Sequence, residues 1–558
     1  MTARIRIRPE KVEIAAEPGE MLGDVLRRAG ISLENECGGQ GTCGRCAVRL
    51  ADGRCDGGAS ENLDAEKARQ GYVLACQARV LSDLVVDVPE ESRAQRASGC
   101  APYLVPETEV PQIDDLSPLS VNRAGPAAPR LGIACDIGTT TVALKLVELS
   151  TGRVLDIVAD YNGQMGCGAD VLSRILYARK ATRLQELRDR VVRTINGLID
   201  TALGRHSASS DAVTAATFAG NTTMTYLLLG FDPQPIRQEL VASALKPIPE
   251  LRGADLGLHV NPAAEILVSP FAGSWVGGDI TAGMLCVALK NRRPRGAELF
   301  IDIGTNGEMV LAGETWMIGC ACSAGPAFEG VGIRCGMRAT GGAIETASVR
   351  HGGRDVSYRV IGDQAPRGIC GSGLIELVAD LFTSGVIGRD GKLRDRIPAD
   401  RLRADGRQRS FIVVAAGESG TGREISISER DITNIMRAKA AIFSACRVFL
   451  RNVGLAVADI ERVYVAGGFG CHLNVAKAIT MGLFPDVDAK RFEYLGNTSL
   501  LGAYLALVSA SQRKRLADIA KRMTYVDLSS EPGYMDEYTA AMFLPHTDTS
   551  LFPRSSKQ

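Results

Sequence analysis

Four cysteines near the N-terminus have the spacing and surroundings of iron ligands. Five residues separate Cys37 from Cys43, two separate Cys43 from Cys46, and twenty-nine separate Cys46 from Cys76. Cysteine thiolates are the usual ligands of iron–sulfur clusters, and the glycines at positions 38, 39, 41 and 44 allow the backbone to wrap tightly around an inorganic guest. Zinc is the alternative, but zinc modules usually offer two close ligand pairs, and this segment has one CxxC. The pattern therefore predicts a one-electron carrier.

A second chemical element occurs twice: an apolar strand, then Asp and a Gly-Thr turn, then another strand. LGIACDIGTTTVALKLVE contains Asp136, and ELFIDIGTNGEMVLAGE contains Asp302, 166 residues later. Glycine permits a tight hairpin whose amides, with neighbouring hydroxyls, can bind phosphate oxygens, and an aspartate can hold a hydrated Mg²⁺. Two copies predict two related lobes that face one another across a nucleotide. The predicted catalytic pair is Asp136 and Asp302, and the predicted phosphate-binding residues are Gly138, Thr139, Thr140, Thr141, Gly304, Thr305 and Asn306.

A third element leaves room for an adenine ring. ERVYVAGGFG places Gly467, Gly468, Phe469 and Gly470 directly after an apolar strand, where the backbone can approach an adenine face without a Cβ in the way. Glycine turns that merely end core strands would explain any one of the three elements, but they explain the ordered set poorly. Together the elements predict a cleft for ATP and Mg²⁺. Hydrolysis is the safer expectation there, because the sequence identifies no sugar pocket.

The elements that must position these residues are visible in the apolar pattern. Residues 4–8 alternate Arg and Ile and the pattern returns through Val12 and Ile14, which predicts a hairpin, and a helix is expected over residues 21–28. From residue 91 to residue 130 the periodicity disappears and six prolines interrupt the chain, which predicts a linker. This linker could let the N-terminal domain move, or it could lie as a strap over the next domain. The sequence leaves both interpretations open.

The composition limits the classes of protein to consider. Lys plus Arg and Asp plus Glu both total 64, so no net charge draws the chain to nucleic acid. The sequence has no run of 18 apolar residues and no signal-peptide core, so a cytoplasmic protein without a membrane partner is expected. Fifteen cysteines without a secretion signal indicate reduced thiols or metal ligands rather than a disulfide framework.

Two stretches of the chain resemble known families. Residues 1–90 resemble the [2Fe–2S] ferredoxins of β-grasp fold, with the first gap of the adrenodoxin-like branch, and residues 131–545 are similar to the acetate kinase, sugar kinase, Hsp70 and actin superfamily. The resemblance implies an α+β and α/β multidomain protein: an N-terminal β-grasp ferredoxin and a two-lobed actin-like ATPase with duplicated RNase H-like lobes. The expected parts are the ferredoxin (1–90), the linker (91–130), the first lobe (131–298), the second lobe with the adenosine site (299–545) and a C-terminal tail (546–558).

The whole chain resembles the reductive activators of corrinoid-dependent enzymes. The resemblance rests on the fusion of the two domains and on NGQMGCGADVLSRI, ACSAGPAFEG, GICGSGLIEL, VAGGFG, LGNTSLLGA and AAMFLPH. It implies that a corrinoid protein oxidised to inactive Co(II) is reduced to Co(I) by one electron from the [2Fe–2S] cluster, with ATP hydrolysis making the transfer feasible. The implied partners are a corrinoid protein of a methyltransferase or demethylase system and an upstream electron donor. The implied assembly is a homodimer.

Ser323, within CACSAGPAFEG, is a candidate corrinoid contact. Its small neighbours permit close approach, and its oxygen could occupy a vacated axial position on cobalt. The alternative is a serine that caps a turn or helix in a loop between the lobes.

Two other functions stay open from the sequence. An activator of a 2-hydroxyacyl-CoA dehydratase or benzoyl-CoA reductase also joins this ATPase fold to iron–sulfur chemistry, but it typically bridges a [4Fe–4S] cluster between subunits and lacks a ferredoxin domain. A non-enzymatic, Hsp70-like redox sensor would use the cluster to regulate binding. The number of irons per cluster distinguishes the dehydratase or benzoyl-CoA reductase activator from a corrinoid activator. A cobalamin-dependent spectral change distinguishes the redox sensor from a corrinoid activator.

Overall fold

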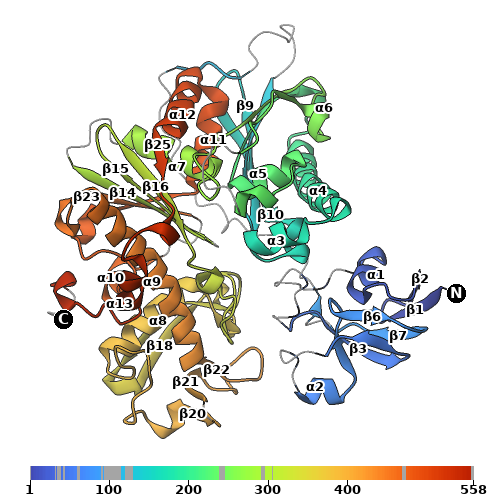
Figure 1. Ribbon diagram of the computed structural model, residues 1–558, viewed down its shortest axis with the longest axis vertical. Helices are drawn as coiled ribbons and strands as arrows, with labels where there is room; N and C mark the ends of the chain where they lie inside the picture. Colours follow the sequence, from blue (N-terminus) through green and yellow to red (C-terminus); the bar gives the residue numbers. More distant parts are fainter. Residues whose placement is uncertain are drawn as a thin grey trace.

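The computed structural model describes residues 2–31, 33, 39, 41, 44–59, 63, 65–89, 92–93, 115–119, 130–237, 245–290, 296–304, 306–406, 408–467 and 473–554. Figure 1 shows an N-terminal domain in blue and two larger lobes of mixed sheet and helix. None of the helices in these ranges is both long and apolar enough to span a membrane. Seven residues singled out in the sequence lie outside the described residues: Cys37, Gly38, Cys43, Thr305, Gly468, Phe469 and Gly470.

The N-terminal domain is a small mixed sheet with a helix packed into its core. Its elements are β1 (Ala3–Arg8), β2 (Val12–Ala16), α1 (Leu22–Arg28), β3 (Ala47–Asp52), β4 (Cys55–Gly57), α2 (Ala65–Arg69), β5 (Tyr72–Leu74), β6 (Ala78–Val80) and β7 (Leu84–Asp87). The expected hairpin is confirmed, because Ile5 of β1 pairs with Ile14 of β2 and the β1 isoleucines are buried while its arginines are exposed. The sheet order is β2-β1-β7-β3-β5, and β7 runs parallel to β1, as in a β-grasp fold.

The first lobe is a six-stranded sheet with helices against it. Its strands are β8 (Leu131–Ile137), β9 (Thr141–Glu148), β10 (Arg153–Tyr161), β11 (Val213–Gly220), β12 (Leu251–Arg252) and β13 (Glu265–Val268), in the order β10-β9-β8-β11-β13-β12. Its helices are α3 (Val171–Tyr177), α4 (Ala181–Arg205), α5 (Thr222–Leu229), α6 (Gly253–Leu256) and α7 (Gly278–Lys290). Leu187, Val191 and Ile195 form a buried stripe on α4 at helical spacing, which packs that helix against the sheet.

The second lobe contains another six-stranded sheet and two smaller ones. The main sheet is ordered β24-β23-β14-β15-β16-β25, from β14 (Ala297–Ile303), β15 (Gly307–Ala312), β16 (Met317–Cys322), β23 (Ile460–Ala466), β24 (Phe492–Gly496) and β25 (Met523–Tyr525). The smaller sheets are formed by β17 (Ala343–Arg350), β18 (Asp355–Val360) and β19 (Gly368–Ile369), and by β20 (Leu402–Asp405), β21 (Gln408–Val414) and β22 (Ile425–Ser428). The helices are α8 (Gly371–Thr383), α9 (Glu429–Asn452), α10 (Val475–Thr480), α11 (Thr498–Val508), α12 (Ala510–Arg522) and α13 (Tyr534–Ala541).

The two main sheets repeat one pattern, which confirms the two related lobes predicted from the sequence. In each, three consecutive strands form an antiparallel meander, β8-β9-β10 in the first lobe and β14-β15-β16 in the second. In each, a later strand joins in parallel beside the first, β11 next to β8 and β23 next to β14. Asp136 and Asp302 therefore occupy equivalent places, one residue before the end of the first strand.

Helices α7 and α11 lie side by side between the two main sheets (Figure 1). Their backbones meet closely, because a Cβ at Gly502 of α11 would lie 2.3 Å from the carbonyl oxygen of Ala282 on α7. Thr217 Oγ1, on β11 of the first lobe, donates to Ala503 O on α11 at 2.8 Å. Helix α11 follows β24 of the second sheet, and these contacts place the start of α11 against the first lobe.

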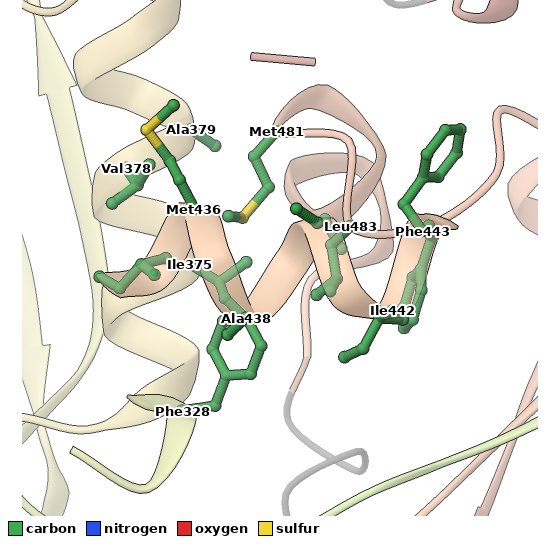
Figure 2. Close-up of a cluster of buried hydrophobic side chains, with 14 of the residues drawn as sticks. Phe328, Ile375, Val378, Ala379, Met436, Ala438, Ile442, Phe443, Met481 and Leu483 are labelled. Carbon is green, nitrogen blue, oxygen red and sulfur yellow. The ribbon is translucent and has the colours of Figure 1, made fainter. Parts of the chain in front are cut away.

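The largest buried core of the second lobe lies between α8 and α9. Figure 2 shows Ile375 and Val378 on α8 beside Met436 and Ala438 on α9, with Phe328 at the edge of the cluster. Phe328 belongs to a short 3₁₀ turn, Pro326–Glu329, and is 2% exposed. Truncating such a phenylalanine costs about 3–5 kcal/mol, so this turn is firmly anchored in the core.

Residues 115–119 of the predicted linker lie as a strap on α11 and α12. The Ser117 amide donates to the last carbonyl of α11, and Asp115 accepts hydrogen bonds from the Ser509 and Ser511 hydroxyls at 2.6 Å and 2.7 Å. Those hydroxyls lower the pKa of Asp115 to about 2. The strap interpretation is therefore confirmed for this part of the linker.

Residues 546–554, in the predicted C-terminal tail, pack against the second lobe. Phe552 is fully buried, and its ring lies 5.1 Å from that of Phe443 on α9. The buried Lys439 of α9 bonds the residues just before this segment. Its Nζ donates to Phe543 O at 2.7 Å and to Pro545 O at 2.5 Å. A buried ammonium that bonds backbone oxygens holds the chain end in place.

Candidate functional site

The turn between β8 and β9 is the first predicted phosphate hairpin. The Gly138 amide donates to Thr141 O at 2.9 Å, and a Cβ at position 138 would lie 2.6 Å from the same oxygen, so the turn requires glycine. Asn162, directly after β10, holds the hairpin at one side. Its Nδ2 donates to Gly138 O at 2.9 Å, and its amide donates to Thr140 O at 2.8 Å.

Arg174 of α3 holds the same hairpin from behind, and sequence reasoning missed it. Its fully buried guanidinium donates to the backbone oxygen of Thr139, to Gly168 O at 2.9 Å and to Gln164 Oε1 at 3.0 Å. Burial lowers the pKa of Arg174 to about 10. A buried cation behind phosphate-binding amides adds positive potential that favours an anion. The signal was the segment NGQMGCGADVLSRI, which carries both Gln164 and Arg174.

The Thr139 and Thr140 hydroxyls bond different kinds of side chain, an amide and a carboxylate. Thr139 Oγ1 accepts a hydrogen bond from Asn221 Nδ2 at 3.1 Å, and Asn221 caps α5 within the segment FAGNTTM. Thr140 Oγ1 reaches across to the second lobe and donates to Glu329 Oε2 at 3.0 Å. Because a carboxylate and a phosphate repel one another, we expect a nucleotide phosphate at this hydroxyl to displace Glu329.

The second hairpin and the first adenosine-motif glycine lie against one another. The Gly304 amide donates to Asn306 O at 3.0 Å, which closes the turn after β14. Gly467, at the end of β23, has φ of 92°, and a Cβ there would lie 2.8 Å from Asp302 Oδ1 and 2.6 Å from Ile303 O. Any larger residue at position 467 would press on the Asp302 carboxylate. The two segments that the sequence assigned to phosphate and adenosine therefore meet.

Asp136 is held by two side chains from the start of α11. Asn497 Nδ2 donates to Asp136 Oδ2 at 2.8 Å, and Ser499 Oγ donates to Asp136 Oδ1 at 2.7 Å. These donors favour the ionised carboxylate, but burial outweighs them and raises the pKa of Asp136 above its ordinary value. The segment LGNTSLLGA thus supplies the orienting partners of Asp136, the first predicted catalytic aspartate.

Four carboxyl groups lie close enough to repel one another, two more than the sequence predicted. Burial, with repulsion from Asp136, raises the pKa of Asp302 to about 7. Burial, with repulsion from Asp302 and Asp136, raises the pKa of Asp279, in the first turn of α7, to about 8. Glu308 on β15 is buried near Asp279 and Asp302, which raises its pKa well above the ordinary value, although the Asn306 side chain opposes this by hydrogen bonding.

This cleft has the chemistry of a magnesium-nucleotide site. Mg²⁺ is usually bound through one or two carboxylates, substrate phosphates and retained waters rather than by a closed cage of protein ligands. Within the described ranges, no group of three or more His, Cys, Asp and Glu side chains is placed to hold a metal ion by itself. Crowded carboxyls with raised pKa values gain stability when a cation and phosphates arrive together. The residues present therefore fit Mg²⁺ with ATP.

Ser323 lies in the loop between β16 and the 3₁₀ turn Pro326–Glu329. It is exposed and directly follows β16, between the buried Cys322 and Ala324. Six residues later, Glu329 bonds the phosphate hairpin, and Phe328 anchors the turn. The exposed Ser323 hydroxyl thus lies on a segment that Phe328 anchors in the core and that contacts the predicted phosphate hairpin through Glu329.

Cys46 and Cys76 are brought together by the strands that carry them. Cys46 precedes β3, Cys76 follows β5, these strands pair, and the Ala75 amide donates to Cys46 O at 3.1 Å. Both cysteines line one cavity of about 470 Å³. Gln77 Nε2 lies 3.9 Å from Cys76 Sγ, within reach of a sulfur-directed hydrogen bond. Two convergent cysteines beside glycines with φ of 75° and 71° at positions 41 and 44 fit a [2Fe–2S] cluster.

The ferredoxin domain touches the first lobe through α1 (Figure 1). The Tyr177 ring lies between two guanidinium groups, that of Arg183 at 4.7 Å and that of Arg27 at 5.7 Å. Arg27 Nε lies 3.4 Å from Glu186 Oε1, and an Arg183 nitrogen lies 3.6 Å from Asp24 Oδ2. Partly exposed ion pairs contribute about 0.2–1 kcal/mol each, and cation–π contacts contribute about 0.5–2 kcal/mol each, depending on how far they are desolvated. The contact is therefore weak and sensitive to salt.

Family models match the chain in three consecutive stretches. Residues 5–81 match the 2Fe-2S iron-sulfur cluster binding domain, and residues 131–292 match the RACo middle region. Residues 296–556 match the C-terminal domain of RACo, the ASKHA domain. The first stretch contains Cys46 and Cys76, and the second contains the hairpin after Asp136. The third contains the hairpin after Asp302 and Gly467 of the predicted adenosine motif.

Relatives match the chain along most of its length. Among solved structures, a "Reductive activator for corrinoid,iron-sulfur protein" is 38% identical with a TM-score of 0.71, and the match covers 99% of this chain and 100% of that one. The "Corrinoid activation enzyme RamQ" of Eubacterium limosum is 28% identical over 95% of this chain and 96% of its own. The "[Co(II) methylated amine-specific corrinoid protein] reductase" of Methanosarcina barkeri is 26% identical over 70% of this chain and 73% of its own. The chain belongs to the RACo family, whose ferredoxin, middle and ASKHA domains it carries in order.

Proposed function

We propose that this protein is an ATP-hydrolysing iron–sulfur reductase that returns a corrinoid protein from Co(II) to Co(I), with one electron from its [2Fe–2S] cluster. In this proposal residues 1–90 carry the electron, residues 131–298 and 299–545 form the ATPase lobes, and residues 91–130 link the two functions. One observation carries the proposal. A cysteine pair beside a cavity and four crowded carboxyl groups beside the two DIGT hairpins occur in one chain, and its relatives are named for corrinoid activation.

ATP hydrolysis is assigned to the cleft between the lobes. The two hairpins would hold the phosphates through their amides and hydroxyls, and Asp136 and Asp302 would hold Mg²⁺, which would neutralise charge on the phosphates. Asp279 is the proposed acceptor of the proton from the attacking water, because its pKa of about 8 is close to neutrality. Burial and repulsion from Asp279 and Asp302 raise the pKa of Glu308 well above its ordinary value. The segment around Gly467 receives the adenosine.

Nucleotide binding is coupled to the corrinoid through the loop that carries Ser323. Phosphate at Thr140 displaces Glu329, and Glu329 ends the turn six residues after Ser323. Cys37, Cys43, Cys46 and Cys76 would hold the cluster, which would supply the electron. An uphill transfer of about 300 mV costs about 7 kcal/mol for one electron, a gap that coupling to ATP hydrolysis can close.

The test of this function uses the reduced holoprotein and Co(II) corrinoid proteins. We expect Co(I) to appear in the visible spectrum when MgATP is added to the reduced protein with a matching corrinoid protein. Partners of the kinds served by the relatives, a corrinoid iron–sulfur protein and a methylated-amine-specific corrinoid protein, are the first to try. Iron content and EPR of the reduced protein must also indicate a two-iron cluster, since a four-iron signal would refute the cluster assignment.

Replacing Ser323 by alanine separates corrinoid reduction from ATP hydrolysis. If the Ser323 hydroxyl contacts cobalt, Ser323→Ala slows Co(I) formation at least about tenfold, a loss of about 1.4 kcal/mol, because the axial oxygen is gone. Phosphate release without a corrinoid partner stays as in the wild type. Ser530→Ala, at another exposed serine of the second lobe, is the matched control and changes neither rate. Equal rates of Co(I) formation in Ser323→Ala and the wild type would remove the assignment.

The stability of the nucleotide-free protein is expected to fall as pH rises. In the folded protein the carboxyls of Asp302 and Asp279 titrate near pH 7 and pH 8, against an ordinary value of 3.8. Between the ordinary pKa of 3.8 and the raised pKa values of the folded protein, the folded state binds more protons than the unfolded chain. The free energy of unfolding therefore decreases as pH rises through this range. MgADP favours the ionised carboxylates, so its addition raises the Tm more at about pH 8.5 than at about pH 6. Thermal scans across this range check both slopes, and a pH-independent MgADP effect would contradict the crowded-carboxyl site.

The setting of the protein is also part of the proposal. We infer that it works in the cytoplasm, where its many cysteines remain reduced. An upstream low-potential protein loads the cluster, and the family resemblance supports a homodimer. Sedimentation of the purified holoprotein tests the dimer independently of activity.

A further inference from the structure

The cavity that holds Cys46 and Cys76 is lined by an excess of positive charge. Its described lining includes five cationic side chains and two acidic ones, Glu20 and Asp24. The cations come from both partners of the contact: Arg27 and Arg79 from the ferredoxin domain, and Lys180, Arg183 and Arg190 from the first lobe. We call Lys180, Arg183 and Arg190 the docking face.

The docking face belongs to the lobe and not to the ferredoxin domain. Lys180 precedes α4, and Arg183 and Arg190 lie on that helix. Arg183 pairs with Asp24 across the contact, and Arg190 pairs with Glu186 of its own helix at 2.9 Å. The positive charge therefore reaches the cluster cysteines only while the ferredoxin domain is docked.

Reduction of a [2Fe–2S] cluster adds one negative charge to it. Cations fixed nearby stabilise that added charge, most strongly in a partly enclosed cavity where the effective dielectric constant is low. By linkage, whatever stabilises the reduced cluster in the docked state also makes the reduced domain dock more tightly than the oxidised domain, by the same factor. A tenfold preference corresponds to about 59 mV in a one-electron potential.

We propose that the docking face is a binding site for the chain's own reduced ferredoxin domain, so that docking raises the reduction potential of the cluster and release lowers it. This rests on the proposed electron-carrying role of the cluster. The docked arrangement is then the electron-loading state, since one electron enters the cluster from a one-electron donor most readily there. The released domain is the stronger reductant and the one that delivers the electron onward.

The experiment compares the midpoint potential of the cluster in the wild-type holoprotein and in a Lys180→Glu/Arg183→Glu double variant. Redox titrations with dithionite, followed by EPR, are run at low and at high salt. At low salt we expect a more negative midpoint in the double variant, by about 59 mV for each tenfold loss of docking preference. High salt moves the wild type toward the variant, because screening weakens the contact. Small-angle scattering checks release, which increases the radius of gyration.

Arg193→Glu is the matched control, because it reverses an exposed cation on the same helix outside the described cavity lining. It is expected to leave the midpoint unchanged, and unchanged iron content in all variants confirms that the cluster domain is folded. Equal midpoints in the double variant and the wild type at low salt would overturn the proposal, as would an equal shift in Arg193→Glu. The titration needs neither ATP nor a corrinoid, so these outcomes are distinct from failure of the proposed reductase function.

Discussion

Replacing Cys76 by alanine is expected to give a protein that contains no cluster and forms no Co(I), but still hydrolyses ATP. Cys76 is the remote ligand, carried by the turn after β5 to the cavity that Cys46 also lines. Without it, three thiolates remain for a cluster that needs four. Iron content, visible absorption, Co(I) formation and phosphate release measure the four parts of this result.

Cys55→Ala is the matched control for the cluster variant. Cys55 is a half-buried cysteine on β4 of the same domain, outside the described cavity lining. Burial raises its pKa to about 11, which disfavours the thiolate that iron requires. We expect full iron content and normal electron transfer in this variant. Stoichiometric iron in Cys76→Ala, or equal loss in both variants, would refute the ligand assignment.

Asp302→Asn is expected to slow ATP hydrolysis at least about 100-fold, a loss of about 2.7 kcal/mol of transition-state stabilisation. Asp302 stands at the end of β14, in contact range of Gly467 and repelled by Asp136, where only a bound cation and phosphates relieve the crowding of charge. An amide keeps the shape but cannot hold Mg²⁺ as a carboxylate does. Phosphate release under saturating MgATP measures the loss, and the cluster should be unaffected.

The same variant is expected to be more stable than the wild type without nucleotide. At about pH 8 it lacks one of the crowded buried charges, so its Tm rises while its turnover falls. Asp211→Asn, at an exposed aspartate of the first lobe, is the control and changes neither quantity. A variant that loses both turnover and stability would indicate a damaged fold rather than a missing catalytic group.

Local patterns predicted much of the fold. The alternation of Arg and Ile in β1 fixed the hairpin, because side chains alternate faces along a strand. The repeated DIGT segment predicted the two equivalent lobes, and both aspartates occupy the same place in their sheets. What local pattern could not predict is the crossing of α11 to the first lobe, since Asn497 and Ser499 lie 361 and 363 residues from Asp136 in the chain.

The candidate site was predictable where a residue type signals its own chemistry. Cysteines and Asp-Gly-Thr turns do so, whereas Arg174 bonds backbone oxygens that any sequence offers. Asp279 and Glu308 look like ordinary acidic residues in the sequence, and only burial and mutual repulsion identify them as site residues. The contact of α1 with Tyr177 was also not predicted, because a few side-chain pairs between domains produce no periodic pattern in the sequence. The roles of Ser323 and of the residues outside the described ranges stay predictions.

The most direct test of coupled reduction follows Co(I) formation and phosphate release together in one anaerobic cuvette. The reduced holoprotein is mixed with a Co(II) corrinoid iron–sulfur protein or a methylated-amine-specific corrinoid protein, with MgATP, with a non-hydrolysable ATP analogue, or with no nucleotide. We predict that sustained Co(I) formation requires MgATP and proceeds in fixed proportion to phosphate released. Equal Co(I) formation without nucleotide, or steady ATP hydrolysis with no Co(I) from either partner, would contradict ATP-driven corrinoid reduction.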